Sequence, residues 1–224
     1  MLPWSDIDTV LLDMDGTLLD LHFDNHFWRE HVPLRYAQRH GLDVDAAKET
    51  LFPKFRALEG TMQWYCVDYW SEALDLDIAE LKAEVDHLIA VHPHVVDFLD
   101  TLSRTDKRSV LVTNAHQKSL DLKMQRTRLG GHFDALICAH DCGQPKENPH
   151  FWRWLQFREP FDPDRTVLID DSLAVLRSGH RYGIRHLLAV RKPDSKGPDR
   201  ETEEFEAIDG FAALLDQLGG RVRS

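Results

Sequence analysis

The sequence predicts an α/β fold: a doubly wound, Rossmann-like parallel sheet with an inserted α-helical cap domain. Short apolar runs alternate with helical patterns, an order typical of a parallel sheet covered by helices on both faces. Residues 21–91 interrupt this alternation, because they show helical periodicity and no convincing strand. The chain has 224 residues, 42% of them hydrophobic, which is enough for one large core and a smaller second domain.

The individual elements follow from these patterns. Buried strands are predicted over residues 7–12, 109–112, 135–138, 166–169 and 186–190. Helices are predicted over residues 93–102, where Pro93 would open the helix, and over 117–129, 149–157, 173–182 and 211–218. The polar stretch 192–206 is predicted as a loop. Residues 1–20 and 92–224 would then form the core domain, and residues 21–91 the cap.

Composition and charge exclude several classes of protein. The formal net charge is −11, and the only dense basic run is Arg221-Val222-Arg223, so a nucleic-acid partner is not expected. The apolar run Val10-Leu11-Leu12 is broken by Asp13, and the first eight residues are polar and acidic, so neither a membrane span nor a signal peptide is expected. The odd number of cysteines, three, argues against a disulfide framework and favours a reduced, cytoplasmic protein.

A metal site built on cysteine is a weaker hypothesis. Cys138, His140 and Cys142 are close in sequence and carry ligand atoms that zinc accepts. A structural zinc site needs four ligands, however, and the sequence has no second pair of cysteines. We therefore expect these residues to be reduced and metal-free.

The first strand is followed directly by Asp13-Met14-Asp15-Gly16-Thr17. In an open parallel sheet, ligands bind at the carboxyl ends of the strands. Two carboxylates this close repel each other unless a partner such as a divalent cation offsets their charge. Gly16 permits a tight turn and close approach of the backbone to a ligand. An ordinary acidic turn explains this motif equally well when the motif is taken alone.

Three further sites favour the ligand-binding interpretation. Thr113 and Asn114 follow the second strand and carry groups that donate to phosphate oxygens, although either residue alone would more often cap a helix. Lys146 precedes a helix and would neutralise a phosphoryl group, although a loop lysine is usually a solvated surface group. Asp170 and Asp171 end the fourth strand, where adjacent buried acids are costly without a cation or donors.

This combination of motifs, in this order and over nearly the whole chain, resembles the haloacid dehalogenase-like hydrolase superfamily, in particular its phosphatases with a helical cap. The resemblance implies that Asp13 is a nucleophile that forms an aspartyl phosphate, and that Asp15 is the general acid and then the general base. Thr113, and with it Asn114, would bind the phosphoryl group. Lys146 would steady the nucleophile and the developing charge.

The resemblance also implies a Mg²⁺ site. Asp171 would be the main side-chain ligand, together with Asp13 and the backbone carbonyl of Asp15. Asp170 would bind directly or through water. Two departures from the usual pattern stand out: Glu147 follows Lys146 where many relatives carry proline, and the last motif reads Asp-Asp. Which of Asp170 and Asp171 contacts the metal is therefore left open.

The cap sequence bears on the substrate. Its aromatic residues fall in two segments, 23–28 and 64–70, and would either stack on a planar base or form the core of the cap. Residues 10–33, 64–78, 113–116, 143–147 and 169–172 resemble the bacterial GMP/IMP nucleotidases of the superfamily, which implies a purine nucleoside 5′-monophosphate as the phosphomonoester substrate. The alternatives are a sugar-phosphate phosphatase or phosphomutase, a dehalogenase, and a catalytically silent ligand-binding module.

Overall fold

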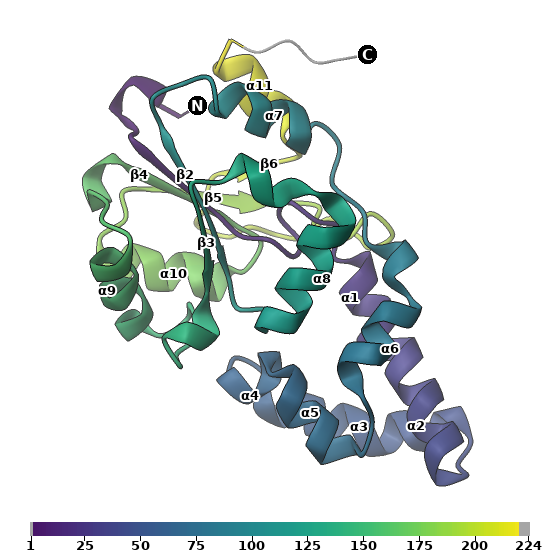
Figure 1. Ribbon diagram of the computed structural model, residues 1–224. Helices are drawn as coiled ribbons and strands as arrows, with labels where there is room; N and C mark the ends of the chain where they lie inside the picture. Colours follow the sequence, from purple (N-terminus) through teal and green to yellow (C-terminus); the bar gives the residue numbers. More distant parts are fainter. Residues whose placement is uncertain (1, 220–224) are drawn as a thin grey trace.

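The computed structural model describes residues 2–219 and contains, within them, one parallel sheet of six strands (Figure 1). The order of the strands is β3-β2-β1-β4-β5-β6. Their bounds are β1 Thr9–Leu12, β2 Arg108–Thr113, β3 Ala135–Cys138, β4 Thr166–Asp170, β5 His186–Val190 and β6 Ala207–Ile208. The predicted doubly wound fold is confirmed. The two-residue strand β6 was not predicted, because it is too short to produce a pattern, and the basic run 221–223 lies outside the described residues.

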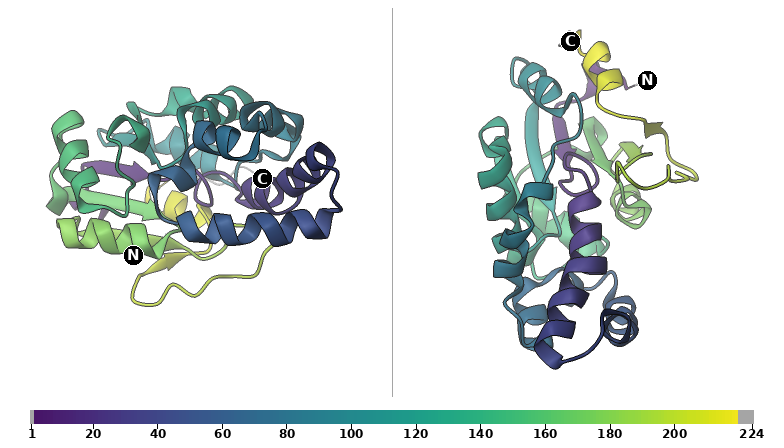
Figure 2. Two further views of the ribbon diagram at one scale, coloured as in Figure 1. Left: turned by 90° about the horizontal axis from the view of Figure 1, so that it is seen from below. Right: turned by 90° about the vertical axis from the view of Figure 1, so that its right-hand side faces the viewer.

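Two layers of helices cover the two faces of this sheet (Figure 2). The helices α9 Pro149–Arg158 and α10 Leu173–Tyr182 pack on one face. The other face is covered by the helices α7 Val95–Leu102, α8 Gln117–Thr127 and α11 Ala212–Gln217. Helix α7 begins at Val95, so the prediction that Pro93 opens it is wrong. Pro93 instead lies before His94, whose left-handed backbone (φ 64°) starts the helix.

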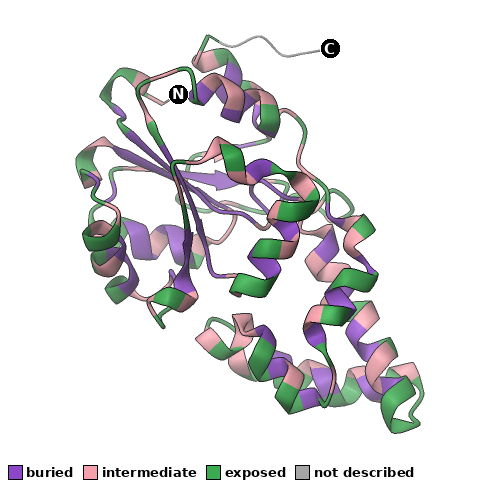
Figure 3. Ribbon diagram, viewed as in Figure 1, coloured by how far each residue is buried: buried purple, intermediate pink, exposed green. Residues whose placement is uncertain are grey.

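The strands are buried on both faces, which explains their continuous apolar runs. Val10 and Leu12 point into the core cluster beneath α7 and α11, and Leu11 points into the cluster beneath α9 and α10. All three are completely buried, and Figure 3 shows the same burial along the central strands. Successive side chains of a strand point to opposite faces, so this one short run contributes to both cores.

Between β1 and β2 the chain forms a helical insertion, defined here as residues 22–88, which contains no strand and lies at the lower right of Figure 1. Its helices are α1 His22–His26, α2 Val32–His40, α3 Val44–Leu58, α4 Met62–Tyr65, α5 Val67–Leu74 and α6 Ile78–Glu84. Asp43, Thr61 and Asp77 cap α3, α4 and α6 by accepting backbone hydrogen bonds, the role for which short polar side chains are favoured at helix starts. A π-helical turn, Phe27–His31, joins α1 to α2.

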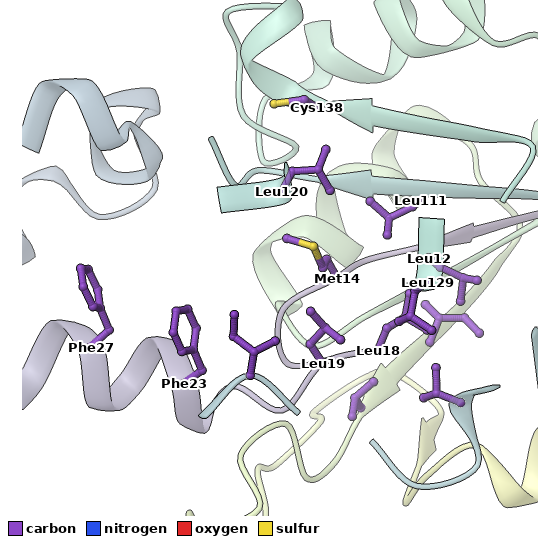
Figure 4. Close-up of a cluster of buried hydrophobic side chains, with 14 of the residues drawn as sticks. Leu12, Met14, Leu18, Leu19, Phe23, Phe27, Leu111, Leu120, Leu129 and Cys138 are labelled. Atoms are coloured by element: carbon purple, nitrogen blue, oxygen red, sulfur yellow. The ribbon is translucent and has the colours of Figure 1, made fainter. Parts of the chain in front are cut away.

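The two connections of the helical insertion run side by side. Leu19 and Val91 form an antiparallel bridge, the Asp20 amide donates to the Ala90 carbonyl at 2.9 Å, and the His92 amide donates to the Leu18 carbonyl at 3.0 Å. Apolar packing also continues across this junction, as Figure 4 shows for Leu18, Leu19, Phe23 and Phe27. The two covalent connections of the insertion therefore lie together, close to the carboxyl end of β1. Within residues 2–219, no helix has the length and apolar character that crossing a membrane requires.

Candidate active site

The carboxyl ends of three neighbouring strands bring the predicted site residues to one edge of the sheet. β1 lies between β2 and β4, and Leu12 pairs with Leu111 on one side and with Ile169 on the other. This is the point where the strand order reverses, which is where open parallel sheets bind ligands. A pocket of about 330 Å³ lies there. Its lining includes all of the predicted site residues: Asp13, Asp15, Thr113, Asn114, Lys146, Asp170 and Asp171.

Lys146 is the centre of a buried ionic cluster. Its Nζ donates to Asp13 Oδ1 at 2.5 Å, to Asp170 Oδ2 at 2.7 Å and to the Val112 carbonyl at 3.0 Å. The side chain is only 2% exposed, so Lys146 is not the solvated loop residue that the alternative interpretation required. Asp13 Oδ2 is buried and has no hydrogen-bond partner among the residues that the structure describes. One oxygen of Asp13 is thus held in place while the other remains available for chemistry.

Burial dominates the electrostatics of this cluster. It raises the pKa of Asp13 to about 7, and although Lys146 opposes the rise, Asp170 and Asp15 add to it. Burial likewise raises the pKa of Asp170 to about 6 and that of Asp171 to about 7. Burial would lower the pKa of Lys146, but Asp13 and Asp170 raise it above its ordinary value. The lysine therefore stays charged, whereas burial disfavours the charged forms of the three carboxyls.

These carboxylates fit a hard divalent cation. One oxygen from each of Asp13, Asp170 and Asp171 lies within 4.8 Å of the other two, and carboxylate oxygens are the ligands that Mg²⁺ prefers. Asp13 Oδ2 has no partner among the described residues, and a cation bound there would favour the charged forms of the carboxyls, which burial disfavours. Gly16 has φ +87°, and a Cβ there would lie 2.6 Å from Asp171 Oδ2. Only glycine leaves room for the Asp171 carboxylate at this turn.

Asp15 belongs to a second buried network that links the sheet to the helical insertion. Lys123 Nζ on α8 lies 2.6 Å from Asp15 Oδ1 and 2.6 Å from Asp24 Oδ2, and Lys82 Nζ on α6 lies 3.0 Å from Asp24 Oδ1. Burial is the main cause that raises the pKa of Asp15; Lys123 opposes it and Asp24 adds to it. The pKa of Asp24 falls to about 2, because Lys123 and Lys82 outweigh burial. Asp15 is thus the member of this network that more readily holds a proton.

Thr113 and Asn114 do not cap the following helix. The cap of α8 is His116, whose Nδ1 accepts a hydrogen bond from the Lys118 amide at 3.3 Å. The Thr113 hydroxyl oxygen accepts from the Ala115 amide at 3.0 Å, so its proton is directed elsewhere. The Asn114 side chain is engaged at both ends: Oδ1 accepts from the Lys146 amide at 2.8 Å, and Nδ2 donates to the Glu147 carboxylate at 2.9 Å.

The helical insertion forms the opposite wall of the pocket. Trp28, Arg29, Trp64 and Tyr65 line it, and the rings of Trp28 and Trp64 are stacked with centroids 6.2 Å apart and planes inclined by 27°. Trp70, by contrast, is 1% exposed and packs inside the insertion. Trp70 thus belongs to the core of the insertion, whereas Trp28 and Trp64 pack against that core and also face the pocket.

A hydrogen-bonded chain connects this wall to Lys146. The Tyr65 hydroxyl donates to Glu147 Oε1 at 2.7 Å, and Glu147 in turn holds Asn114, which accepts from the Lys146 amide. Glu147, the position where the sequence departs from the resembled pattern, is thus a contact between the insertion and the core. Burial, and then the Glu147 carboxylate, raise the pKa of Tyr65 well above its ordinary value, so Tyr65 keeps the proton that it donates.

The three cysteines are free thiols in the structure. The weaker hypothesis of a metal site on Cys138, His140 and Cys142 is wrong, because these three do not form a group of metal ligands among the described residues. Cys138 is buried in the core, and its thiol donates to the Ala115 carbonyl at 3.1 Å. In the described part of the chain, the cysteine that lies with His140 is Cys66, and His116 is their third neighbour.

Sequence reasoning missed four charged residues of the site: Lys82, Lys123, Glu147 and Arg200. Lys82 and Lys123 lie inside helical patterns, and their only signal is a lysine on a face that must be buried. Arg200 lies in the polar loop after β5 and donates to Asp171 Oδ2 at 2.9 Å. A loop arginine carries no sequence signal of its own, since its partner depends on how the loop folds back over the sheet.

Comparisons with known proteins agree with this geometry. The chain matches the family described as haloacid dehalogenase-like hydrolase over residues 7–183. It is 37% identical over 217 residues to the GMP/IMP nucleotidase YrfG of Escherichia coli (strain K12), which covers 97% of this chain and 98% of that protein.

Two solved structures share the fold. The HAD phosphatase from Thermococcus onnurineus has a TM-score of 0.80 at 23% identity, covering 97% of this chain and 100% of that chain. The HAD-hydrolase YfnB from Bacillus subtilis, solved bound to magnesium, has a TM-score of 0.68 at 19% identity, covering 95% and 99%. The family match, the near full-length relative and the strand-end carboxylates lead to one conclusion: the chain belongs to the haloacid dehalogenase-like hydrolase family and is an enzyme of its phosphatase kind.

Proposed function

We propose that the chain is a Mg²⁺-dependent phosphomonoesterase that acts through an aspartyl phosphate on Asp13, with a purine nucleoside 5′-monophosphate as its substrate. The observation that carries the proposal is the buried cluster in which Lys146 holds Asp13 Oδ1 while Asp13 Oδ2 has no partner among the described residues. A carboxylate with one fixed and one free oxygen is oriented for attack.

In the first step, a carboxylate oxygen of Asp13 attacks phosphorus and the bond from phosphorus to the ester oxygen breaks. Asp15 donates its proton to the departing oxygen, which leaves as the alcohol. The raised pKa of Asp15 supports this role, because a general acid must still hold its proton near neutral pH. Lys123 fixes the orientation of the Asp15 carboxyl through its 2.6 Å contact.

In the second step, water attacks phosphorus and the bond between phosphorus and Asp13 breaks, which releases phosphate. Asp15, deprotonated by the first step, accepts the proton of this water. Lys146 would neutralise the phosphoryl group and the Thr113 hydroxyl would donate to its oxygens. Both residues line the pocket, and Lys146 contacts Asp13, which supports these roles. Asn114 positions Lys146 through the backbone amide of that lysine.

A Mg²⁺ ion at this site would neutralise phosphoryl charge, the main requirement of phosphoryl transfer. We assign Asp13, Asp171 and the backbone carbonyl of Asp15 as its ligands. Both oxygens of Asp170 already accept hydrogen bonds, from Lys146 Nζ at 2.7 Å and from the Ser172 amide at 2.9 Å. Asp171 is bound instead by Arg200, whose side chain is 47% exposed and free to turn away. Asp170 would therefore not bind the metal ion directly, but would act on it through Lys146 or a bound water.

Residues 21–91 would act as a cap that closes over this pocket and opens to release product. The paired connections at Leu19–Val91 and Asp20–Ala90 support a hinge there, because two adjacent strands of backbone can bend together without unpacking the insertion. Closure would exclude water, which strengthens every electrostatic contact around the phosphoryl group.

A purine base would lie against Trp28, Trp64 and Tyr65. The full-length likeness to the GMP/IMP nucleotidase YrfG supports this choice of substrate, and large aromatic side chains at the pocket wall are suited to a planar base. The cap core residue Trp70 would not take part.

The test is phosphate release from a panel of nucleoside monophosphates, sugar phosphates and p-nitrophenyl phosphate, with Mg²⁺ and with EDTA. We expect release from GMP and IMP above all other compounds, and none with EDTA. Preference for a sugar phosphate would overturn the substrate assignment, and turnover that requires a bisphosphate activator would indicate a phosphomutase. Unchanged release in EDTA would overturn the metal assignment. Halide release from haloacids would indicate a dehalogenase.

A further inference from the structure

A second cluster of metal-binding side chains lies outside the carboxylate site. Cys66, His116 and His140 each offer one ligand atom, and these three atoms lie within 4.8 Å of one another. The rings of His116 and His140 meet edge to face with centroids 4.8 Å apart. His140 Nε2 is buried and has no hydrogen-bond partner among residues 2–219. A buried imidazole nitrogen without a partner is costly, so a ligand for it is the natural expectation.

The three residues come from both the helical insertion and the core. Cys66 lies between α4 and α5 in the helical insertion, whereas His116 precedes α8 and His140 follows β3 in the core. The adjacent contacts are also between insertion and core: Tyr65 with Glu147, and Lys118 Nζ with Asp68 at 2.6 Å. The cluster therefore exists only while the insertion lies against the core as it does in this structure.

We propose that Cys66, His116 and His140 form a binding site for a divalent metal ion of the zinc class, which clamps the helical insertion against the core. A thiolate and two imidazoles are ligands that zinc prefers and that Mg²⁺ does not. The fourth position would be taken by water or by Asp68, whose Oδ2 lies 3.7 Å from His116 Nε2. The cysteine proton is released on binding, because the metal ligand is the thiolate.

The clamp would lower the rate of turnover. This consequence rests on the proposed function, in which the insertion must open to release product. A metal ion bound to ligands on both sides stabilises the closed arrangement by its binding free energy, since that arrangement alone presents all three ligands. Binding through His116 Nε2 would leave the ring proton on Nδ1 and end the 3.3 Å contact with the Lys118 amide, so the start of α8 should loosen.

Binding is tested without any activity measurement. The full chain, kept reduced and saturated with Mg²⁺, is titrated with Co²⁺ as a spectroscopic substitute for zinc. We expect a thiolate-to-cobalt charge-transfer band, which a carboxylate site cannot produce, and its loss when Zn²⁺ is added. Cys66→Ser should remove the band. Both Cys66→Ser and His140→Ala should weaken Zn²⁺ binding by more than about 100-fold, because losing even a residue that only hydrogen-bonds to a metal ligand lowers metal affinity by about 10–100-fold.

Two controls separate this site from others. Cys142→Ser removes another half-buried free cysteine and should keep the band. Asp171→Ala disables the carboxylate site and should also keep it. Melting temperatures of all variants without zinc identify any that fail to fold, in which case Cys66→Ala replaces Cys66→Ser. Absence of a thiolate band in the wild type, or its persistence in Cys66→Ser, would overturn the proposal.

The clamp is tested by inhibition of phosphate release at saturating Mg²⁺. The activity of each variant is divided by its own activity without Zn²⁺. We expect wild type and Cys142→Ser to be inhibited at zinc concentrations that leave Cys66→Ser active. Equal inhibition of Cys66→Ser would mean that zinc acts at the carboxylate site and would overturn the clamp. A thiolate band in a chain that releases phosphate from no compound would instead leave this site standing and overturn the proposed function.

Discussion

Lys123 Nζ lies 2.6 Å from Asp15 Oδ1 and is 1% exposed, so the proposed general acid is held by a lysine from a helix more than 100 positions away in sequence. The same ammonium group holds Asp24 of the helical insertion at 2.6 Å. The orientation of Asp15 and the position of the insertion therefore depend on one side chain.

Replacing this lysine should change the pH dependence of the reaction. Lys123 lowers the pKa of Asp15, against burial, so Lys123→Met should raise it further. Asp15 must be protonated in the first step, and the alkaline limb of kcat/KM should therefore shift to higher pH. Loss of orientation should lower kcat by about 10²-fold. Lys118→Met, on the exposed side of the same helix, is the matched control. If Lys123→Met folds but the alkaline limb of its kcat/KM profile does not shift, Lys123 does not control the protonation of Asp15.

Asp13→Asn should abolish turnover. An amide does not form the acyl phosphate on which the mechanism depends. The fold should survive, because the substitution removes a buried carboxyl whose charged form is already disfavoured, as its raised pKa of about 7 indicates. Phosphate release and the melting temperature are measured together. Near-normal release from a correctly folded variant would disprove the nucleophile assignment.

Asp15→Asn should separate substrates by their leaving groups. The variant cannot protonate the departing oxygen, which should lower the rate by roughly 10²–10⁴-fold for GMP or IMP. The loss should be smaller for p-nitrophenyl phosphate, whose leaving group needs little protonation. Substrate binding should persist, because the proposed metal contact of Asp15 is through its backbone. Equal losses for both substrates are incompatible with the role.

Mg²⁺ and protons should compete for the carboxylate cluster. Without metal, burial raises the pKa of Asp13 to about 7, and of Asp170 and Asp171 to about 6 and 7. A bound cation favours the charged forms and lowers these pKa values. The acid limb of kcat/KM should therefore move to lower pH as the Mg²⁺ concentration rises. An acid limb that is independent of Mg²⁺ would indicate that these carboxyls do not bind the metal.

The same shifts predict how stability depends on pH. The folded pKa values lie above the ordinary 3.8, so the folded chain holds protons that the unfolded chain has already released. Without metal, this contribution to stability should be lost as the pH rises from about 4 to about 7. The increase in melting temperature that Mg²⁺ produces should accordingly be small near pH 5 and larger near pH 8. A uniform increase across this range would contradict the assignment.

Trp64→Leu should affect nucleotides more than small substrates. Trp64 lines the pocket beside Trp28, and loss of base stacking should cost about 1–3 kcal/mol of binding. The effect should appear in kcat/KM for GMP and be nearly absent for p-nitrophenyl phosphate. Trp70→Leu is the matched control, because Trp70 is 1% exposed and packs inside the insertion. It should lower the melting temperature and affect both substrates alike. If Trp64→Leu and Trp70→Leu changed kcat/KM for both substrates and the melting temperature equally, Trp64 would be a packing residue of the insertion like Trp70.

The sequence by itself was sufficient for β1 to β5, though not for the short strand β6, and for the edge where the site lies. Buried parallel strands appear in the sequence as continuous apolar runs. The bounds of β1 to β5 were therefore predicted to within two residues. Residues that end neighbouring parallel strands must meet, so Asp13, Thr113 and Asp170 were predicted together from local patterns alone. The prediction needed no knowledge of how the helices pack.

Only the tertiary structure decided which side chains complete the site. Lys123 meets Asp15 and Asp24 across 108 and 99 positions, and Tyr65 meets Glu147 across 82. Cys66 lies with His116 and His140 rather than Cys138 and Cys142. Lys123 meets Asp15 through the packing of α8 on the sheet. The other pairs depend on how the helical insertion rests on the core, where apolar packing continues around the connections near Leu19 and Val91. Hydrophobic packing is not directional, so no local pattern in the sequence records which polar groups it brings into contact.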